Sequence, residues 1–345
     1  MKITRLERTV VCVPFLSGIL PPPEYEEFST SYPAPLGQRR QDVLRIHTDD
    51  GLTGIGMSGP YYGERADTTP DVIGKDPLEF EPRDLGGGGY NIALLDLIGK
   101  AIGWPLCRVF GGKFQEHVLV DYWISRMGPE ASANAARCAS LEGFKGIKIK
   151  CKIDDGDVAD RVHAINEAAP SLRIVLDPGH RFYTVEKTLE LARQIERYDL
   201  VFEDPIPKDD MEDYRRLKEE TDIIIAAHFQ NSRQVIEAVH TQSVDAINVA
   251  PSDWAFLDMA RIAAAGGIPV WQASNVDLGV FDAFRLHASA AVTNCTLGSD
   301  LCGNFVHEHS LLVEPLVQDG YAAVTEKPGL GIELDEDAVM RYAVA

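Results

Sequence analysis

The chain has 345 residues, of which 45% are hydrophobic and 25% are charged, a composition typical of a folded globular protein. Its 53 acidic and 33 basic residues give a formal net charge of −20, which argues against nucleic acid or an anionic membrane surface as a partner. Six scattered cysteines without a paired spacing, and no run of the roughly 18 apolar residues that cross a bilayer, indicate a cytoplasmic protein.

The first 115 residues predict an α+β region. Residues 2–15 and 40–59 read as antiparallel strands, the second pair joined by an Asp-Asp-Gly turn. The Pro-rich loop 17–35 between them is typical of a functional lid or a disordered segment. Residues 89–112 predict an apolar helix that stops at Gly103.

From about residue 118 the chain repeats one pattern, in which a short β-rich apolar run is followed by an amphipathic stretch. The runs end at intervals of 22 to 28 residues, a spacing typical of βα units on a parallel sheet. The runs are 118–122, 146–150, 173–177, 200–203, 223–228, 246–250, 269–274 and a weaker 294–297. Eight runs favour a closed barrel, whose active site lies at the carboxyl ends of the strands.

The run 146–150 ends in two lysines. Lys148 and Lys150 are two residues apart on a strand, so their side chains face the same side. If that side is the barrel interior, each ammonium lowers the pKa of the other and provides a usable base. The opposite orientation, with both lysines among the helices and Ile147, Ile149 and Cys151 inside, fits this run equally well.

The next runs end in acidic residues and a histidine. Asp177 and Glu203 each end an apolar run, and a buried carboxylate there needs a cation or several donors. Two such groups on neighbouring strands predict a divalent ion with oxygen ligands, although helix capping or an ion pair with a barrel lysine is the alternative. His228 ends the following run, where a ligand role and a structural role are equally compatible.

Taken together, several segments resemble the enolase superfamily, and most closely its mandelate racemase and muconate lactonizing enzyme group. They are the N-terminal strands, ALLDLIGKAIGWPLCRVFGG, the Lys-Ile-Lys strand, the acids of the third and fourth runs, and the closing GLGIELDEDA. The resemblance implies an α/β fold, with a modified (β/α)7β TIM-type barrel over 118–318. It also implies an α+β capping domain over 1–117, completed by the C-terminal segment 319–345.

The same resemblance implies roles for individual residues. Lys150 corresponds to the catalytic base and Lys148 to its electrostatic partner. Asp177 and Glu203 correspond to ligands of a Mg²⁺ ion that stabilises an enediolate. The third ligand is usually an acid or Asn, and here His228 stands in its place. Because imidazole suits Mn²⁺ or another transition metal better than Mg²⁺, the identity of the ion stays open.

The second acid/base group of both main subgroups is absent from its usual place. Ala250 stands where the muconate-type enzymes carry a second lysine, and the run VWQASN has no histidine. Asp277 resembles an acidic residue of the muconate-type pattern and is a candidate to assist catalysis. We further predict that Tyr61 and Tyr62, within the loop 58–64, contact the substrate.

Three functions are compatible with these residues. A single base favours dehydration of a hydroxy acid or sugar acid over racemisation, and cycloisomerisation of the muconate type is the alternative. A catalytically inactive barrel that only binds a ligand is the third possibility. Further predicted substrate contacts are Tyr122, Ser274 and Asn275 at strand ends. The expected partners are a small-molecule carboxylate and further copies of this chain in a homo-oligomer.

Overall fold

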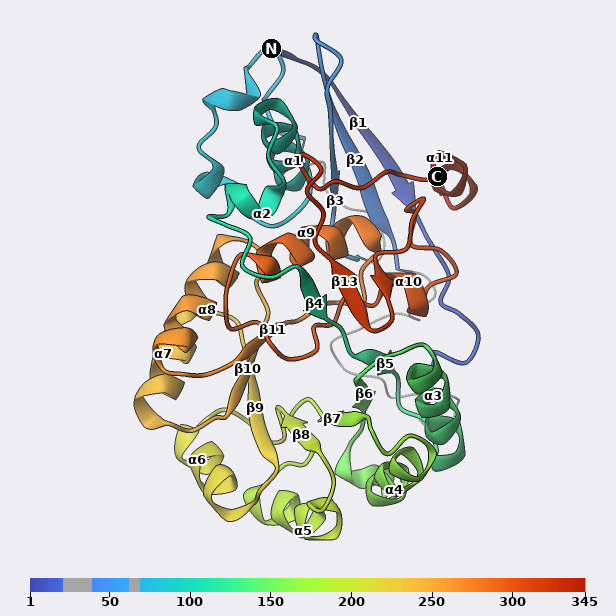
Figure 1. The fold of residues 1–345 in the computed structure, drawn as a ribbon, viewed down its shortest axis with the longest axis vertical. Coiled ribbons are helices and arrows are strands. Elements are labelled where there is room, and N and C mark those ends of the chain that lie inside the picture. The colour runs from blue at the N-terminus through green and yellow to red at the C-terminus, as the bar shows by residue number, and fades with distance from the viewer. Residues whose placement is uncertain (21–38, 62–68, 345) are drawn as a thin grey trace.

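The computed structural model describes residues 1–20, 39–61 and 69–344. It places an N-terminal antiparallel sheet with its helices against a parallel α/β sheet (Figure 1). Most of the predicted lid loop 17–35, and Tyr62, lie outside the described residues. Within the described ranges, no helix combines the length and the apolar character needed to cross a bilayer.

The N-terminal sheet has the strand order β1 (Ile3–Val11), β2 (Gln41–Thr48) and β3 (Thr53–Met57), all antiparallel. Helix α1 (Tyr90–Ile102) packs closely on β3. Gly54 permits this approach, because a Cβ at its position would lie 2.1 Å from the carbonyl oxygen of Ala93 in α1. The helix ends at Gly103 in the left-handed conformation, as the sequence predicted, and the short α2 (Leu106–Val109) follows.

The C-terminal segment returns to this N-terminal region. Val344 donates its N–H to the carbonyl of Val10 at 2.9 Å, directly after the terminal helix α11 (Glu336–Arg341). A second small sheet joins the strands β12 (Val317–Gln318), β13 (Tyr321–Ala323) and β4 (His117–Leu119). Residues on both sides of the expected boundaries therefore share one sheet.

The parallel sheet has seven strands that pair in chain order from β5 to β11. They are β5 (Tyr122–Ile124), β6 (Gly146–Lys150), β7 (Arg173–Asp177), β8 (Leu200–Glu203), β9 (Ile224–Phe229), β10 (Ala246–Val249) and β11 (Val270–Gln272). Three predicted runs coincide with β6, β7 and β8. The predicted strand 118–122 is wrong, because that run divides between β4, which pairs with the tail, and β5.

The weak run 294–297 forms no strand of its own, but the segment that contains it connects the two edges of the sheet. Two of its hydrogen bonds reach β11. The carbonyl of Asn294 accepts the N–H of Val270 at 2.8 Å, and Asp300 donates its N–H to the carbonyl of Gln272 at 2.9 Å. On the other side, Ser299 donates its N–H to the carbonyl of Leu119 at 2.8 Å. Hydrogen bonds thus run from β11 through this segment to the residues just before β5.

The inner and outer faces of the sheet are packed differently. Inward-facing side chains form their own apolar cluster, made of Val175, Val201, Ala226, Ala246 and Trp271. Figure 1 shows the helices along the outer face. They are α3 (Pro129–Leu141), α4 (Val158–Ala168), α5 (Val185–Ile195), α6 (Met211–Glu220), α7 (Ser232–Thr241) and α8 (Trp254–Ala265).

Helix α9 (Gly279–Ala290) lies between the parallel sheet and the N-terminal region, and every one of its residues is buried. The short helix α10 (Gly303–Val306) follows the connecting segment. The polar residues of α9 are therefore enclosed by protein, where a charged side chain is costly unless it is paired.

Candidate active site at the carboxyl ends of the parallel strands

Strand β6 directs both of its lysines into the interior. Lys148 pairs with Val175 and Lys150 with Asp177 on the neighbouring strand β7, and paired residues of parallel strands face the same side. Val175 belongs to the inner apolar cluster, so the lysines face inward as well. Of the two orientations that the sequence left open, the structure has the inward one.

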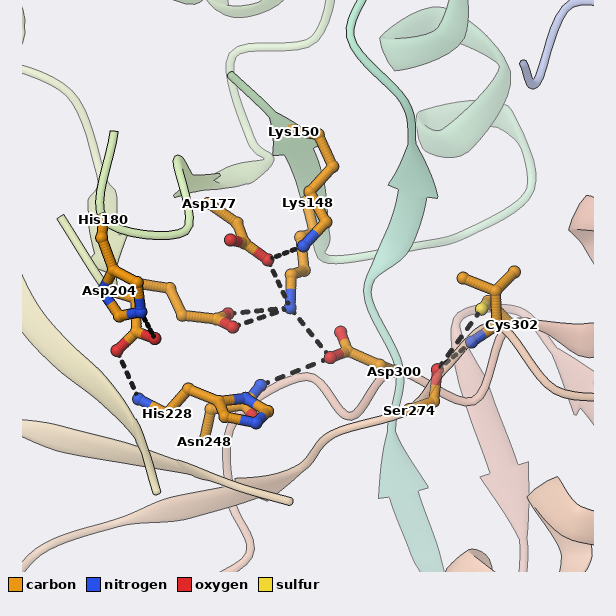
Figure 2. A network of polar contacts seen from close by, with 12 residues as sticks. Lys148, Lys150, Asp177, His180, Asp204, His228, Asn248, Ser274, Asp300 and Cys302 are labelled. Carbon is orange, nitrogen blue, oxygen red and sulfur yellow. Dashed lines mark hydrogen bonds and ion pairs between the residues drawn. The ribbon is translucent and has the colours of Figure 1, made fainter. Parts of the chain in front are cut away.

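The ammonium group of Lys148 meets three carboxylates (Figure 2). Its Nζ lies 2.8 Å from Glu203 Oε2, 2.9 Å from Asp300 Oδ2 and 3.3 Å from Asp177 Oδ2. Lys150 Nζ donates to the same oxygen of Asp177. We call these five residues the lysine cluster; it joins three acidic side chains to two cations in a buried place.

Burial and charge act in opposite directions on the lysines. Burial lowers the pKa of Lys148, but Asp300, Glu203 and Asp177 raise it by more. Burial also lowers the pKa of Lys150, yet the charge of Asp177 outweighs both burial and the repulsion from Lys148. Lys148 does lower the pKa of Lys150, as predicted, but the net shift is upward rather than downward, because the Asp177 carboxylate is in contact with Lys150.

The acids of the cluster respond in opposite ways. Burial raises the pKa of Asp177, but Lys150 and Lys148 lower it by more, so this carboxyl stays ionised. Burial raises the pKa of Glu203 to about 8, with Lys148 opposing the rise and the charges of Asp177 and Asp300 adding to it. The cluster thus has one acidic side chain more than it has ammonium groups, and Glu203 is the acid that retains a proton near neutral pH.

Asp300 is the member of the cluster that the sequence reading missed. It lies in the connecting segment, three residues beyond the weak run 294–297, and only 4% of its surface is exposed. Asn248 on β10 donates from Nδ2 to Asp300 Oδ2 at 3.3 Å. The available signal was its position, since an acid follows this run by three residues, whereas Asp177 and Glu203 are the last residues of theirs.

His228 lies next to Asn248 on the adjoining strand β9 (Figure 2). Its backbone N–H donates to Asp204 Oδ1 at 2.7 Å, and Lys208 donates to the other oxygen of Asp204 at 2.5 Å. Burial lowers the pKa of the His228 imidazole. The ring is therefore neutral, the form in which a histidine can serve as a metal ligand.

The oxygen donors around Lys148 are of the chemical type that a hard divalent cation prefers, although the described residues do not hold them in a preformed site. In the part of the chain that the structure describes, Asp300 Oδ1 and Asn248 Oδ1 are buried without a hydrogen-bond partner. Carboxylate and amide oxygens are the ligands that Mg²⁺ prefers, and a bound cation would stabilise the ionised form of Glu203, the third acid of the lysine cluster. Among those same residues, no three His, Cys, Asp or Glu side chains stand in a preformed ligand arrangement, and the Lys148 ammonium lies between the acids.

Two of the predicted tyrosines, Tyr122 and Tyr61, lie outside the lysine cluster. Tyr122 begins β5 rather than ending it, and its ring stacks on Phe305 at 5.2 Å and meets Phe144 at 5.1 Å. It pairs with Ile147, whose side chain faces away from the lysines, so its expected place at a carboxyl end is wrong. Tyr61 lies in the N-terminal region, where its hydroxyl donates to Asp42 at 2.6 Å.

The remaining predicted residues lie in the turn after β11. Ser274 accepts the N–H of Val276 at 3.0 Å, and Asp277 accepts the N–H of Asn275 at 3.1 Å. Asp277 is fully buried, and its carboxylate forms an ion pair with Arg285 on α9. The contacts of Asp277 thus join it to α9 and to its own turn rather than to the two lysines.

Comparison with known proteins identifies relatives along nearly the whole chain. The family described as "Enolase C-terminal domain-like" matches residues 130–338, which is more than half of the sequence. The N-succinyl-L-Arg/Lys racemase of Bacillus cereus is 23% identical over 86% of this chain and 85% of its own length. The arabinonate dehydratase of Saccharolobus solfataricus is 25% identical, covering 79% and 76%. The chloromuconate cycloisomerase of Cupriavidus pinatubonensis is 25% identical, covering 90% and 94%.

Solved structures share the fold as well. The crystal structure of the Bacillus cereus N-succinyl Arg/Lys racemase superposes with a TM-score of 0.80, at 21% identity, over 100% of this chain and 99% of its own. The dipeptide epimerase of Enterococcus faecalis, in complex with Mg and the dipeptide L-Leu-L-Tyr, superposes with a TM-score of 0.76 at 21% identity. That alignment covers 96% of this chain and 100% of the epimerase.

Proposed function

Because this chain belongs to the enolase superfamily, in the group of mandelate racemase and muconate lactonizing enzyme, we propose that it removes a proton next to a substrate carboxylate. The base is Lys150, and the substrate is a hydroxy acid or sugar acid that loses water. The observation that carries this proposal is the pair of inward-facing lysines beside Asp177 and Glu203.

The two lysines have different roles in this reaction. Lys148 touches three carboxylates, which hold its proton, so it offers a fixed positive charge to the substrate carboxylate. Lys150 contacts one carboxylate of the cluster, and 25% of its side chain is exposed, so it can turn toward a substrate. It acts as a base after it gives up its contact with Asp177 and releases its proton.

We propose that Asp177 and Glu203 hold a divalent cation, with His228 as the third ligand. The oxygen donors favour Mg²⁺, and the imidazole makes Mn²⁺ or another divalent metal an alternative. When bound, the cation supplies positive charge to the carboxylate side of the substrate and so stabilises the enediolate.

One base is sufficient for dehydration. Lys150 takes the α-proton, the C–O bond to the neighbouring hydroxyl group breaks, and the protonated Lys150 returns the proton to the departing oxygen as water forms. Racemisation requires a base on each face of the carbon, and this chain has Ala250 where related enzymes carry a second lysine. Cycloisomerisation is the second candidate, because it also needs one acid/base group and a cycloisomerase matches 90% of this chain.

The finer architecture belongs to the same proposal. We assign residues 118–318 to a modified (β/α)7β barrel, with 294–300 as its closing segment. Hydrogen bonds from this segment to β11 and to Leu119 support this assignment. Residues 1–117 then form the cap and 319–345 complete it, which the hydrogen bond between Val344 and Val10 supports.

The proposal is tested by incubating the protein with Mg²⁺ or Mn²⁺ in deuterated water and a library of sugar acids, hydroxy acids and lactones. Nuclear magnetic resonance detects exchange of the α-proton, and a carbonyl reagent detects the 2-keto acid that dehydration yields. We expect at least one acid to exchange its α-proton and to form a 2-keto acid. Formation of a lactone would favour cycloisomerisation, and the absence of exchange across the library would contradict proton abstraction.

A further inference from the structure

The turn after β11 contains a backbone conformation that its residue rarely adopts. Val276 has a φ of +57°, in the left-handed region, and it is branched at Cβ. Such a residue is disfavoured there, and it persists only when the surroundings determine the conformation. Strained residues of this kind cluster at functional sites, so the contacts that hold Val276 indicate what the turn is for.

The polar groups of this turn are fixed from two sides. Within the turn, Val276 donates its N–H to Ser274 Oγ at 3.0 Å. From the N-terminal region, Arg39 donates to the carbonyl of Asn275 at 2.5 Å. From the residues after α10, His307 donates from Nε2 to the carbonyl of Val276 at 3.1 Å. The turn therefore connects the carboxyl ends of the parallel strands to the N-terminal region.

Asp277 lies at the centre of these contacts. One oxygen of its carboxylate accepts the N–H of Asn275 at 3.1 Å and forms the ion pair with Arg285. The other oxygen accepts from Gln41 Nε2 at 3.4 Å, and Gln41 also donates to the carbonyl of Ser58 at 3.2 Å. A single buried carboxylate thus connects α9, the strained turn and the edge of the N-terminal sheet.

Gln41 belongs to an edge of the N-terminal sheet in which residues 39–42 and 58–61 are hydrogen-bonded to each other. Arg40 and Tyr61 exchange two backbone hydrogen bonds of 2.9 Å each, and Ser58 Oγ accepts the N–H of Asp42 at 2.7 Å. Residues 39–42 and 58–61 are therefore bonded to each other, and the Gln41 side chain connects them to Asp277.

We infer that Asp277 is a positioning residue, which fixes the strained turn and sets the register of the edge 39–42 and 58–61 over the strand ends. Its carboxylate is fully buried and engaged with Arg285, Asn275 and Gln41, so it is not the group that moves the substrate proton. The inference rests on the proposed function only in taking the strand ends as the substrate site.

Hydrogen exchange tests the inference without any substrate. In Asp277→Asn, the amides of 40–42, 58–61 and 275–276 should exchange roughly 10- to 100-fold faster, because a hydrogen bond to a charged group is lost. The amides of β6, β7 and β8 should keep their parental rates. Asp282→Asn is the matched control, since Asp282 is also buried beside Arg285 but accepts from Gly303, outside the turn. Unchanged exchange of 40–42 and 58–61 in Asp277→Asn would overturn the inference.

A second variant covers the case in which Asp277→Asn does not fold. Gln41→Met keeps the length of the side chain and removes its donor, so exchange at 58–61 and 275–276 should also accelerate, by about 3- to 10-fold. Parental exchange in this variant would overturn the attachment through Gln41.

Kinetics with a substrate from the library separate positioning from proton transfer. Asp277→Asn should raise KM by about tenfold and change kcat by less than about threefold, because positioning acts on binding. A kcat loss of about 10²-fold or more at saturating substrate would identify Asp277 as a proton carrier and overturn the inference. A library without any substrate would contradict the proposed function alone, since the exchange result stands independently.

Discussion

Two buried groups of charge lie at the same end of the parallel sheet, and they differ in what they can do. The lysine cluster contains cations that can release a proton, and one of them, Lys150, has 25% of its side chain exposed. The arginine cluster, which comprises Asp277, Asp282 and Arg285, is at most 3% exposed, and a guanidinium does not release its proton. The two clusters therefore share burial and charge, and they differ in whether a cation can release its proton and reach solvent, which is why we propose the lysine cluster as the catalytic one.

The largest effect is expected when Lys150, the proposed general base of the lysine cluster, is replaced. Lys150→Met keeps the apolar stem and removes the amine, so exchange of the substrate α-proton should fall by about 10²–10⁴-fold or more. Nuclear magnetic resonance in deuterated water measures the exchange. Lys113→Met is the control, because Lys113 is a mostly buried lysine paired with Glu116 and Glu326, outside the cluster. Exchange at the parental rate in Lys150→Met would place the base elsewhere.

The second prediction tests whether Glu203, the third acid of the lysine cluster, binds a metal. Glu203→Gln should weaken binding of Mg²⁺ or Mn²⁺ by more than the roughly 10–100-fold that loss of an outer-shell partner costs. Isothermal titration calorimetry measures the affinity, circular dichroism checks the fold, and the exposed Glu186→Gln is the control. Unchanged affinity would make Glu203 structural. A parental protein that binds neither ion would favour a barrel that only binds a ligand.

The sequence predicted the strands of this site better than its electrostatics. Strands β6, β7 and β8 match their predicted runs because apolar β-rich segments bounded by polar residues define them locally. Because these three strands are neighbours in the sheet, their predicted ends place four side chains close together: Lys148, Lys150, Asp177 and Glu203. The sign of the shift in the pKa of Lys150 could not be predicted, because it depends on the contact with Asp177 across strands.

Other features depend on long-range contacts that local patterns do not show. Asp300 was missed because its segment forms only isolated bridges to both edges of the sheet, so its run is weak in the sequence. Tyr122 was misplaced because β4 and β5 follow each other within one apolar run, and only the pairing of β4 with the tail separates them. The place of Asp277 in the arginine cluster depends on α9, whose residues are buried throughout.

The third prediction concerns the arginine cluster, where a carboxyl group affects stability. Burial raises the pKa of Asp282 from 3.8 to about 8, with Arg285 opposing the rise and Asp277 adding to it. The folded state therefore binds the proton more tightly than the unfolded state, and this contribution to stability is lost as pH rises from about 4 to about 8. The contribution is on the order of a few kcal/mol.

Asp282→Asn removes this dependence. Urea unfolding at about pH 5 and about pH 8 should show a smaller fall in the free energy of unfolding for the variant than for the parent. Asp84→Asn, at an exposed position in the N-terminal region, serves as the control and should keep the parental fall. Equal falls in the parent and Asp282→Asn would mean that the carboxyl is ionised in the folded state, and the arginine cluster would then carry full charge.

The smallest effect is expected outside both clusters, at Tyr122, whose side chain faces away from the two lysines. Tyr122→Phe retains the ring that stacks on Phe305 and meets Phe144, and it removes only the hydroxyl. Because β5 begins at Tyr122 and directs it away from Lys148, we expect kcat/KM to change by less than about twofold. Loss of the hydroxyl should change the free energy of unfolding by less than about 1 kcal/mol. A rise in KM of more than about tenfold would show that the hydroxyl reaches the substrate, and substrate contact would then not be confined to the inward-facing strand ends.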